Sequence, residues 1–490
     1  MSSMSSDTPF RMKKLRKSIF RFAKKRVGEA RARKMALNLM KLRYKLSPRP
    51  SIRIAQAIKV GENSLFLQGQ IVDIRKSIVS IDVVFANRST MRIDHSIRYL
   101  NDQSTPHRRA LVQLGLSSGF IALVDFDDEV NGAMNIEGLR FTLSSQRVVY
   151  VAVDLLDAAN EPLEHVKRIL ASVPGHSSDK RKLFDEVYGP TLKQVWAARS
   201  LQRPNAEIVD YNSDKAIEEP IVSLIVPIYG RYDFIEHQIS VFVNDESMRK
   251  HEILYVVDDP RIAEEVKGSC DALSRIYPIA FRVMYLAKNM GYAGANNMGV
   301  EHARGRAILL LNSDVMPSKN GWLDEMLETV GDSLDRSVTG ARLIYEDYTV
   351  QHDGMRFFAS PFVNDLWTNI HPGKGLPADL FVEEEPLLDR EAVTGACLLV
   401  TRENYLGCGG LNESYILGDY EDSDLCMRCR QLGLNIQLAN RIVLFHLERQ
   451  SQSLMTEDRW KDELTFFNCW QHYHLWNEDI QSMKRTGTNG

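Results

Sequence analysis

Acidic residues gather in the stretch GDYEDSDLCMRCRQLG, residues 418–433. Glu421, Asp422 and Asp424 stand at the start of a segment that is typical of a helix ending at Gly433. The N–H groups of a helix start can keep a carboxylate ionised and oriented, and such a carboxylate can take a proton from an incoming hydroxyl. A well-capped acidic first turn would have the same sequence, so the stretch by itself leaves both interpretations open.

A second group that could do chemistry follows an apolar run. Asp314 comes directly after AILLLNS, where a carboxylate is costly unless it meets a cation or a helix N-terminus. A divalent cation that bridges two phosphates would satisfy it. His446 ends the apolar run RIVLFH, and a neutral imidazole can join a carboxylate as a metal ligand. The alternatives are a turn capped by Asp314 and a histidine that is only hydrogen-bonded.

Glycine and asparagine crowd the start of a helix that we expect at about 293–304. Gly291 and Gly294 would let the backbone approach an anion at the unpaired N–H groups of the helix, and Gly305 would end it. The amides that could read a base or a ribose belong to Asn289, Asn296 and Asn297. Turn and cap roles would explain the same residues.

Strands that alternate with helices must position these groups. From Pro220 onward the apolar runs IVSLIVPIY, HEILYVVDD, FRVMYLAKN and RAILLLNSD predict a largely parallel sheet with helices on both faces. Ligands bind beyond the carboxyl ends of the strands in such sheets. The residues expected at that edge are Tyr229, Asp258, Asp259, Asn289, Asn312 and Asp314.

The rest of the chain divides by its sequence patterns. Short alternating runs at 51–158 predict an antiparallel β-sandwich-like accessory domain with no catalytic spacing. We expect a helical linker at 159–219, the α/β domain at 220–455 and a helical C-terminal extension at 456–490.

Cysteine spacing and hydropathy indicate the compartment. The 6 cysteines follow no disulfide framework, which suits a reducing environment, and Cys426 and Cys429 are expected to be ordinary helix residues and not zinc ligands. No run of about 18 apolar residues and no secretory signal is evident. We therefore expect a cytoplasmic protein.

The N-terminal arm, residues 1–50, is strongly basic. It holds 16 Lys and Arg residues against Asp7 and Glu29, a net charge of +14, so the other 440 residues carry −17. Within it, Leu15, Ile19, Phe22 and Ala23 fall on one helical face among basic residues. This pattern is typical of a helix lying on an anionic membrane surface, and we assign that role to residues 10–46. A solvated basic tail and an arm that contacts nucleic acid are the alternatives, of which we do not expect the second.

Nine motifs then occur in a recognisable order: VSLIVPIYGR, YVVDD, NMGYAGANNMG, LLLNSD, VQHDG, VTGACLLVTRE, GGLNESY, YEDSDLCMR and HLERQS. Together they resemble the inverting family 2 glycosyltransferases, especially rhamnosyltransferase-like enzymes of bacterial surface polysaccharide biosynthesis. The resemblance covers residues 220–455.

The resemblance implies a GT-A fold, a Rossmann-like α/β domain that binds a nucleoside diphosphate sugar. It implies a UDP-, dTDP- or GDP-linked donor, a Mg²⁺ or Mn²⁺ ion, and a glycan or lipid-linked acceptor. Because such acceptors are often lipid-linked, it also fits an enzyme at the inner face of the cell membrane.

The resemblance also implies roles for individual residues. Asp422 would be the base and Glu421 would act beside it, while Asp314 would be the direct metal ligand and His446 the second. The nucleotide-sugar site would include Pro227, Tyr229, Asp258, Asn289, Gly291, Gly294, Asn297, Asn312, Ser313, Thr394 and Gly395. The sequence departs from the family where Asn312 replaces a common Asp and where Asp-Pro follows Asp258, which leaves metal affinity and base preference open.

Two other functions fit parts of the sequence. A nucleotidyltransferase would normally have a glycine- and lysine- or arginine-rich triphosphate loop near the first strand, and PIYGRYDF does not supply one. A noncatalytic sugar-nucleotide or glycan-binding protein could lose its base, yet Glu421, Asp422 and Asp424 are all present. We therefore favour an enzyme.

The basic arm makes a testable prediction. Deleting residues 1–46 should move the protein from the membrane fraction to the soluble fraction of a cell lysate, because 15 positive charges and the apolar face leave with the arm. Fractionation and immunoblotting measure the change. Unchanged partitioning between the two fractions would contradict the membrane role.

Overall fold

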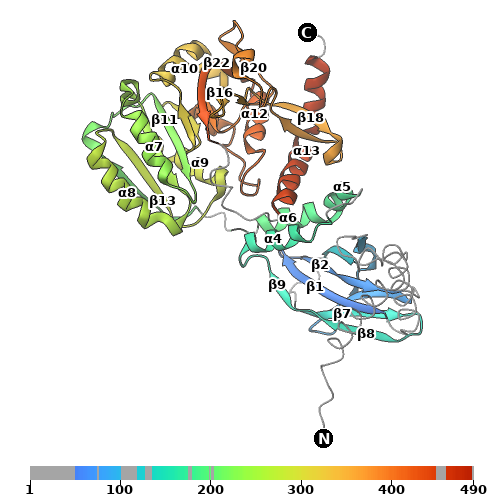
Figure 1. Cartoon of the computed structure of the whole chain (residues 1–490). Coiled ribbons are helices and arrows are strands. Elements are labelled where there is room, and N and C mark those ends of the chain that lie inside the picture. Colours follow the sequence, from blue (N-terminus) through green and yellow to red (C-terminus); the bar gives the residue numbers. More distant parts are fainter. Residues whose placement is uncertain are drawn as a thin grey trace, which may run out of the picture. The chain divides into compact units, whose positions relative to one another are not determined.

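The computed structural model describes residues 50–73, 77–100, 119–126, 135–174, 179–197, 199, 203–447 and 460–487. The basic arm lies outside these residues apart from Pro50, so its predicted helix stays a prediction. The chain divides into two compact units, Met1–Arg199 and Ser200–Gly490 (Figure 1).

Two β-sheets build the N-terminal unit. One runs in the order β5-β6-β2-β1-β9 and the other in the order β4-β3-β7-β8. Their bounds are β1 (Ser51–Val60), β2 (Ser64–Val72), β3 (Ile78–Phe85), β4 (Thr90–Arg92), β5 (Arg98–Leu100), β6 (Gly119–Asp125), β7 (Ile136–Leu143), β8 (Val148–Ala152) and β9 (Leu155–Asp157). Leu65 and Phe120 of the first sheet share one apolar core with Val83 and Phe141 of the second, as in a β-sandwich.

One strand pair departs from the antiparallel arrangement that the sequence suggested. Ala57, Ile58 and Lys59 of β1 pair in parallel with Leu155, Leu156 and Asp157 of β9. A parallel pair needs a long connection between its strands, and here the rest of the sandwich forms that connection.

Helices follow the sandwich within the same unit. They are α4 (Pro162–Ala171), α5 (Lys180–Leu183), the π-helical turn Phe184–Tyr188 and α6 (Gly189–Ala197). The ring of Tyr188 lies 6.3 Å from the ring of Phe66 in β2, so these helices pack on the sandwich. The predicted helical linker at 159–219 is thus wrong in part, since residues 206–211 form a strand of the second unit, β10 (Ala206–Tyr211).

The second unit is built on a mixed sheet in the order β10-β13-β12-β11-β14-β21-β16-β22-β15. Its strands are β11 (Val222–Ile228), β12 (Glu252–Val257), β13 (Phe281–Leu286), β14 (Ala307–Leu311), β15 (Val315–Pro317), β16 (Ser337–Ile344), β21 (Cys397–Thr401) and β22 (Asn435–His446), with β17 (Val350–His352) and β20 (Leu387–Asp389) beside it. A separate hairpin is formed by β18 (Arg356–Ser360) and β19 (Leu366–Ile370).

The expectation of a largely parallel sheet holds only for part of these strands. β13, β12, β11 and β14 are mutually parallel, as the apolar runs predicted. β10 and β21, which flank them, pair antiparallel. Because β21 starts where β14 ends, residues 394–396 lie beside the carboxyl end of the parallel strands.

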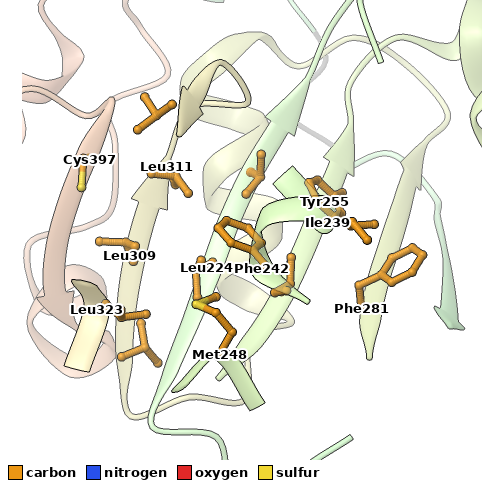
Figure 2. Packing of buried hydrophobic residues seen from close by; sticks show 14 of the residues in the cluster. Leu224, Ile239, Phe242, Met248, Tyr255, Phe281, Leu309, Leu311, Leu323 and Cys397 are labelled. Atoms are coloured by element: carbon orange, nitrogen blue, oxygen red, sulfur yellow. The ribbon is translucent and has the colours of Figure 1, made fainter. Parts of the chain in front are cut away.

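Helices cover both faces of this sheet, because alternate strand residues point to opposite sides. On one face lie α7 (Asp233–Phe242), α8 (Ala263–Ile276) and α10 (Trp322–Val330). On the other lie α9 (Gly291–Glu301), α11 (Arg402–Gly407), α12 (Glu421–Gln431) and part of α13 (Trp460–Gly487). Figure 2 shows Phe242 of α7 beside Leu224 of β11, and Ile239 of α7 beside Tyr255 of β12.

The helix expected at about 293–304 is α9, Gly291–Glu301. It ends before Gly305, so the prediction that Gly305 caps it is wrong. A Cβ at Gly305 would lie 2.6 Å from the backbone nitrogen of Ser223 in β11. The Gly305 N–H donates to Ser223 Oγ at 2.8 Å, and the glycine therefore permits a close backbone approach.

Among the described residues, no helix has the length and apolar character needed to cross a membrane.

This close approach predicts that Gly305→Ala destabilises the second unit by about 1–3 kcal/mol, because the new methyl group meets backbone and not a movable side chain. The midpoint of urea unfolding measures the loss. Gly268→Ala is the matched control, since nothing lies within 4 Å of a Cβ at that exposed site in α8. It should be neutral or stabilise by about 0.5–1 kcal/mol. Equal midpoints for the two variants would contradict the packing role.

Candidate functional site

The Asp422 carboxylate is held by two backbone N–H groups. Asp422 Oδ2 accepts from the Gly395 N–H at 3.1 Å, and Oδ1 accepts from the Ser423 N–H at 2.7 Å. Asp422 is the second residue of α12, and Gly395 lies just before β21. The structure thus brings together two predicted site residues that are 27 positions apart.

Opposing effects set the proton affinity of Asp422. Burial raises the pKa of its carboxyl group, while the Gly395 and Ser423 N–H groups and the Thr394 side chain lower it by hydrogen bonding. The net direction is upward. A carboxylate with a raised pKa accepts a proton more readily. Asp422 is half-buried and not fully buried, so part of the residue stays accessible.

Glu421 lies beside it in a different environment. The residue is 6% exposed, and its buried Oε2 has no hydrogen-bond partner among the described residues. Burial, and then the charge of Asp422, raise the pKa of Glu421 well above its usual range. Its environment therefore favours the neutral acid, because burial outweighs the backbone hydrogen bond that lowers its pKa, whereas Asp422 accepts from two backbone N–H groups.

The turn at Thr394 and Gly395 joins three other segments. The Tyr292 hydroxyl of α9 donates to the Gly395 carbonyl at 2.9 Å, and the Thr394 N–H donates to His352 Nε2 at 3.3 Å. The Asn312 N–H donates to the Ala396 carbonyl at 3.0 Å. A Cβ at Gly395 would lie 2.8 Å from the Tyr292 hydroxyl oxygen, so only glycine fits without moving that tyrosine.

Asp314 and His446 also meet, as the sequence suggested for two metal ligands. Asp314 Oδ1 lies 3.3 Å from His446 Nε2, and both side chains are largely buried. Strand pairing causes this, since Val315 of β15 stands opposite His446 of β22. The Leu447 N–H donates to the Asp314 carbonyl at 3.0 Å and fixes the pair further.

The residues of this loop fit a hard divalent cation. Asn312 Oδ1 is buried and has no hydrogen-bond partner among the described residues, which leaves an oxygen available in the loop that carries Ser313 and Asp314. Gln238 of α7 fixes the loop, because its Nε2 donates to the Asn312 and Val315 carbonyls, both at 3.1 Å. In the described part of the chain no group of three or more His, Cys, Asp or Glu is placed to hold a metal, so a cation here would need further ligands from water or a bound phosphate.

The ends of β11 and β12 form the edge where a nucleotide was expected. Tyr229 is 45% exposed and follows β11, in which Pro227 is half-buried. The Arg261 guanidinium lies 5.7 Å from the Tyr229 ring centroid. Asp259 holds that guanidinium with two hydrogen bonds of 2.8 and 2.7 Å. An aromatic ring next to a fixed cation suits a base and its phosphates.

Asp258 ties β12 to the start of α9. It is 3% exposed, and its Oδ1 accepts from the Met290 N–H at 2.6 Å. Asn289 accepts from the Gly291 N–H at 2.9 Å, which shapes the turn in which Gly291 has a φ of +74°. Gly294 lies buried inside α9 and not before it. Whether Asp258 and Asn289 also contact a nucleotide stays a prediction.

The role predicted for Asn297 in nucleotide binding is wrong in this arrangement. Its Nδ2 donates to the Leu411 carbonyl and to Glu413 Oε1, each at 2.9 Å. Its Oδ1 accepts from the Tyr405 hydroxyl at 2.7 Å and from the Leu411 N–H at 2.9 Å. The amide has no further donor or acceptor to offer, so Asn297 anchors the 411–413 segment to α9.

Sequence reasoning missed several polar residues around the site. They are Arg231, Tyr292, His352, His371, Asn369 and the α13 residues Asn468 and His472. The motif VQHDG pointed to His352, whose Nδ1 lies 3.0 Å from His371 Nδ1. The PIYGR motif contained Arg231, whose pKa is raised, chiefly by its bond to Asp233 and in part by the charge of Asp314.

Comparison with known proteins places part of the second unit in a family. Residues 223–374 match the model of the family described as "Glycosyl transferase family 2". These residues form a family 2 glycosyl transferase domain. The family expected from the nine motifs is confirmed, and so is the α/β GT-A fold class for this domain.

Individual proteins are also similar to this chain. The protein y4gI of Sinorhizobium fredii is 28% identical over 235 residues, which cover 48% of this chain and 25% of that protein. The O-antigen biosynthesis protein RfbC of Myxococcus xanthus is 26% identical over 251 residues, which cover 49% of this chain and 18% of that protein. This chain therefore spans a quarter or less of the length of either relative.

Among solved structures, GalNAc-T7 with UDP, GalNAc and Mn²⁺ is similar with a TM-score of 0.38 and 12% identity. The similarity covers 46% of this chain and 44% of that one.

The raised pKa of Glu421 predicts a pH-dependent stability. Above the ordinary pKa of a glutamic acid the unfolded chain releases this proton while the folded chain keeps it, so stability falls as pH rises toward the folded-state pKa. Glu421→Gln removes this loss. The variant should gain stability over wild type at pH 8 and gain much less at pH 5, as measured by urea unfolding.

Glu246→Gln is the control, because the Glu246 side chain is 91% exposed. Its stability curve should run parallel to that of wild type. A Glu421→Gln curve that also runs parallel would mean that Glu421 is ionised in the folded protein.

Proposed function

We propose that this protein is a metal-dependent inverting glycosyltransferase. It would move a sugar from a nucleoside diphosphate sugar to a hydroxyl of a glycan or lipid-linked acceptor in polysaccharide biosynthesis. The family 2 domain and the name of the relative RfbC support the reaction class and the setting. The observation that carries the proposal is the Asp422 carboxylate, held by the Gly395 and Ser423 N–H groups beside the turn that contacts the Asn312–Asp314 loop.

Asp422 would act as the general base. Its carboxylate would accept the proton of the acceptor hydroxyl while that oxygen attacks the anomeric carbon from the face opposite the diphosphate. The bond from the anomeric carbon to the acceptor oxygen forms as the bond to the diphosphate oxygen breaks, and the configuration inverts. The two N–H groups would keep the carboxylate aimed. Because the acceptor oxygen attacks the anomeric carbon directly, no covalent enzyme intermediate is required.

Asp314 and His446 would hold the cation, with Asn312 as a further oxygen donor in the same loop. A bound Mg²⁺ or Mn²⁺ supplies charge that stabilises the departing diphosphate. Arg231, whose guanidinium is influenced by the charge of Asp314, and Arg261 at the Tyr229 edge would add positive charge on the nucleotide side.

The remaining nucleotide contacts follow from the strand ends. Pro227 and Tyr229 would border the base and ribose, with Asp258, Asn289 and Gly291 forming the floor between β12 and α9. Thr394 and Gly395 would lie where sugar and acceptor meet, since they contact Asp422 directly. A UDP-, dTDP- or GDP-linked donor fits this proposal, and the cytoplasm, at the membrane's inner face, is the proposed setting.

The proposed function is tested with a panel of UDP-, dTDP- and GDP-sugars, Mn²⁺ or Mg²⁺ and extracted acceptor glycans or lipids, measuring release of nucleoside diphosphate. Wild type should turn over one donor. Asp422→Asn should reduce turnover by about 10²- to 10⁴-fold, because general base catalysis contributes about that much, while calorimetric donor binding persists. Asp332→Asn, a substitution at an exposed aspartate outside the site, is the control.

Metal binding has its own readout. Paramagnetic resonance of Mn²⁺ in the presence of nucleoside diphosphate should show binding to wild type and to Asp422→Asn, and weak binding to Asp314→Ala. Donor binding without turnover of any donor by wild type would favour the noncatalytic sugar-nucleotide-binding protein instead.

A further inference from the structure

The segment just before Asp422 has an unusual backbone. Leu417, Gly418, Asp419 and Tyr420 have successive φ angles of +64°, +145°, +75° and +75°. Left-handed backbone is unfavourable for residues with a Cβ and persists where the surrounding structure imposes it. Tyr420 is also the N-cap of α12, and no side chain caps that helix. The direction of the first turn of α12, which carries Asp422, therefore depends on this segment.

Asn468 of α13 brackets the segment at its start. The residue is 0% exposed. Its Nδ2 donates to the Ile416 carbonyl at 3.1 Å and to the Gly418 carbonyl at 2.5 Å, and its Oδ1 accepts from the Ile416 N–H at 3.2 Å. One buried amide thus holds the backbone on both sides of Leu417. Nearby, the Thr465 hydroxyl donates to Asp419 Oδ2 at 2.8 Å.

His472, one turn further along α13, holds the end of the segment. Ser423 Oγ donates to the Tyr420 carbonyl at 3.0 Å and accepts from Asn369 Nδ2 at 2.8 Å. His472 Nε2 lies 3.2 Å from the same Ser423 oxygen and can therefore donate to it. Burial lowers the pKa of His472 to about 3, so the ring is neutral. The same serine donates its N–H to Asp422, which links α13 to the carboxylate through one residue.

Trp476 supplies a third contact on the same face of α13, since residues four apart lie one above the other. Its Nε1 donates to Asp424 Oδ1 at 2.9 Å. Asp424 is 1% exposed and also accepts from the Tyr415 hydroxyl and the Arg428 guanidinium. Asp424 is therefore an anchor of α12 and has no oxygen facing the reaction.

We propose that Asn468 and His472 are positioning residues that hold segment 417–420 in its left-handed conformation and thereby aim the Asp422 carboxylate. Neither residue needs to contact a substrate. The inference rests on the proposed function, in which Asp422 is the base. It extends the catalytic apparatus to α13, a helix outside residues 223–374 of the family 2 domain (Figure 1).

The test compares the same substitution at two positions of α13. Asn468→Asp keeps the side-chain size but removes the N–H donors to the Ile416 and Gly418 carbonyls. Asn477→Asp is the control, because Asn477 Oδ1 acts as an acceptor for Trp367 and Gln481 and an aspartate can do the same. We expect Asn468→Asp to lower kcat at least 10-fold with donor KM and calorimetric Kd within twofold, and Asn477→Asp to change neither by more than twofold.

A second substitution separates positioning from general destabilisation. Leu417→Gly, added to Asn468→Asp, should restore several-fold of the lost kcat, because glycine adopts a positive φ without strain. A glycine substitution otherwise tends to lower the stability of a folded protein, so general destabilisation would not give this recovery. A milder substitution serves if Asn468→Asp does not fold. Thr465→Val, at an exposed site, removes only the hydrogen bond to Asp419. It should lower kcat about 2- to 5-fold, which is the effect expected for the loss of one hydrogen bond.

The outcomes distinguish the two proposals. Full activity of Asp422→Asn would refute the proposed base and this inference with it. An inactive Asp422→Asn together with wild-type kcat in both Asn468→Asp and Thr465→Val would leave the proposed function standing and overturn the positioning role. A loss confined to KM, or no recovery on adding Leu417→Gly, would also overturn it.

Discussion

The whole site depends on how one carboxylate is solvated. Burial would keep the Asp422 carboxyl neutral, and the Gly395 and Ser423 N–H groups replace part of the lost water. Both donors belong to the backbone, so their positions are set by secondary structure and not by side-chain rotamers. Gly395 can donate only because its turn lies beside the first residues of α12, with no Cβ to displace Tyr292. Fixed donors of this kind need no reorganisation when charge moves.

Environment divides three neighbouring acids into three roles. Glu421 has a buried oxygen without a partner and is driven toward the neutral acid. Asp422, with its two N–H donors, can be an anion that still binds a proton. Asp424 is surrounded by Trp476, Tyr415 and Arg428 and anchors the helix. Residues of the same chemical type in one helical turn thus have different roles because their burial and hydrogen-bond partners differ.

Antiparallel pairing at the edge of the parallel strands assembles the site. β21 begins where β14 ends, which sets Ala396 against Asn312, and β15 pairs with β22, which sets Asp314 against His446. In a wholly parallel sheet, the strand next to β14 would begin at the edge where β14 begins, and not at the edge where β14 ends. The antiparallel strand β21 contradicts the expected largely parallel sheet, and the same strand brings the turn at Thr394 to the Asp314 loop.

The order of the motifs, the strand ends and the residue types were enough to predict the family, the α/β fold and the pairing of Asp314 with His446. They also pointed to Asp422, which we propose as the base. These follow from sequence because buried strands and the polar residues after them are local patterns. Local patterns could not show that the Asn297 amide forms its hydrogen bonds with residues 411–413, that Gly305 packs on Ser223, or that residues 206–211 join the sheet. Nor could they reveal that Asn468 and His472 hold the backbone before Asp422. Those roles are decided by contacts between segments about 50 to 110 residues apart. An asparagine or a glycine has the same local sequence whether it meets a ligand or a distant strand, and only the tertiary structure determines which.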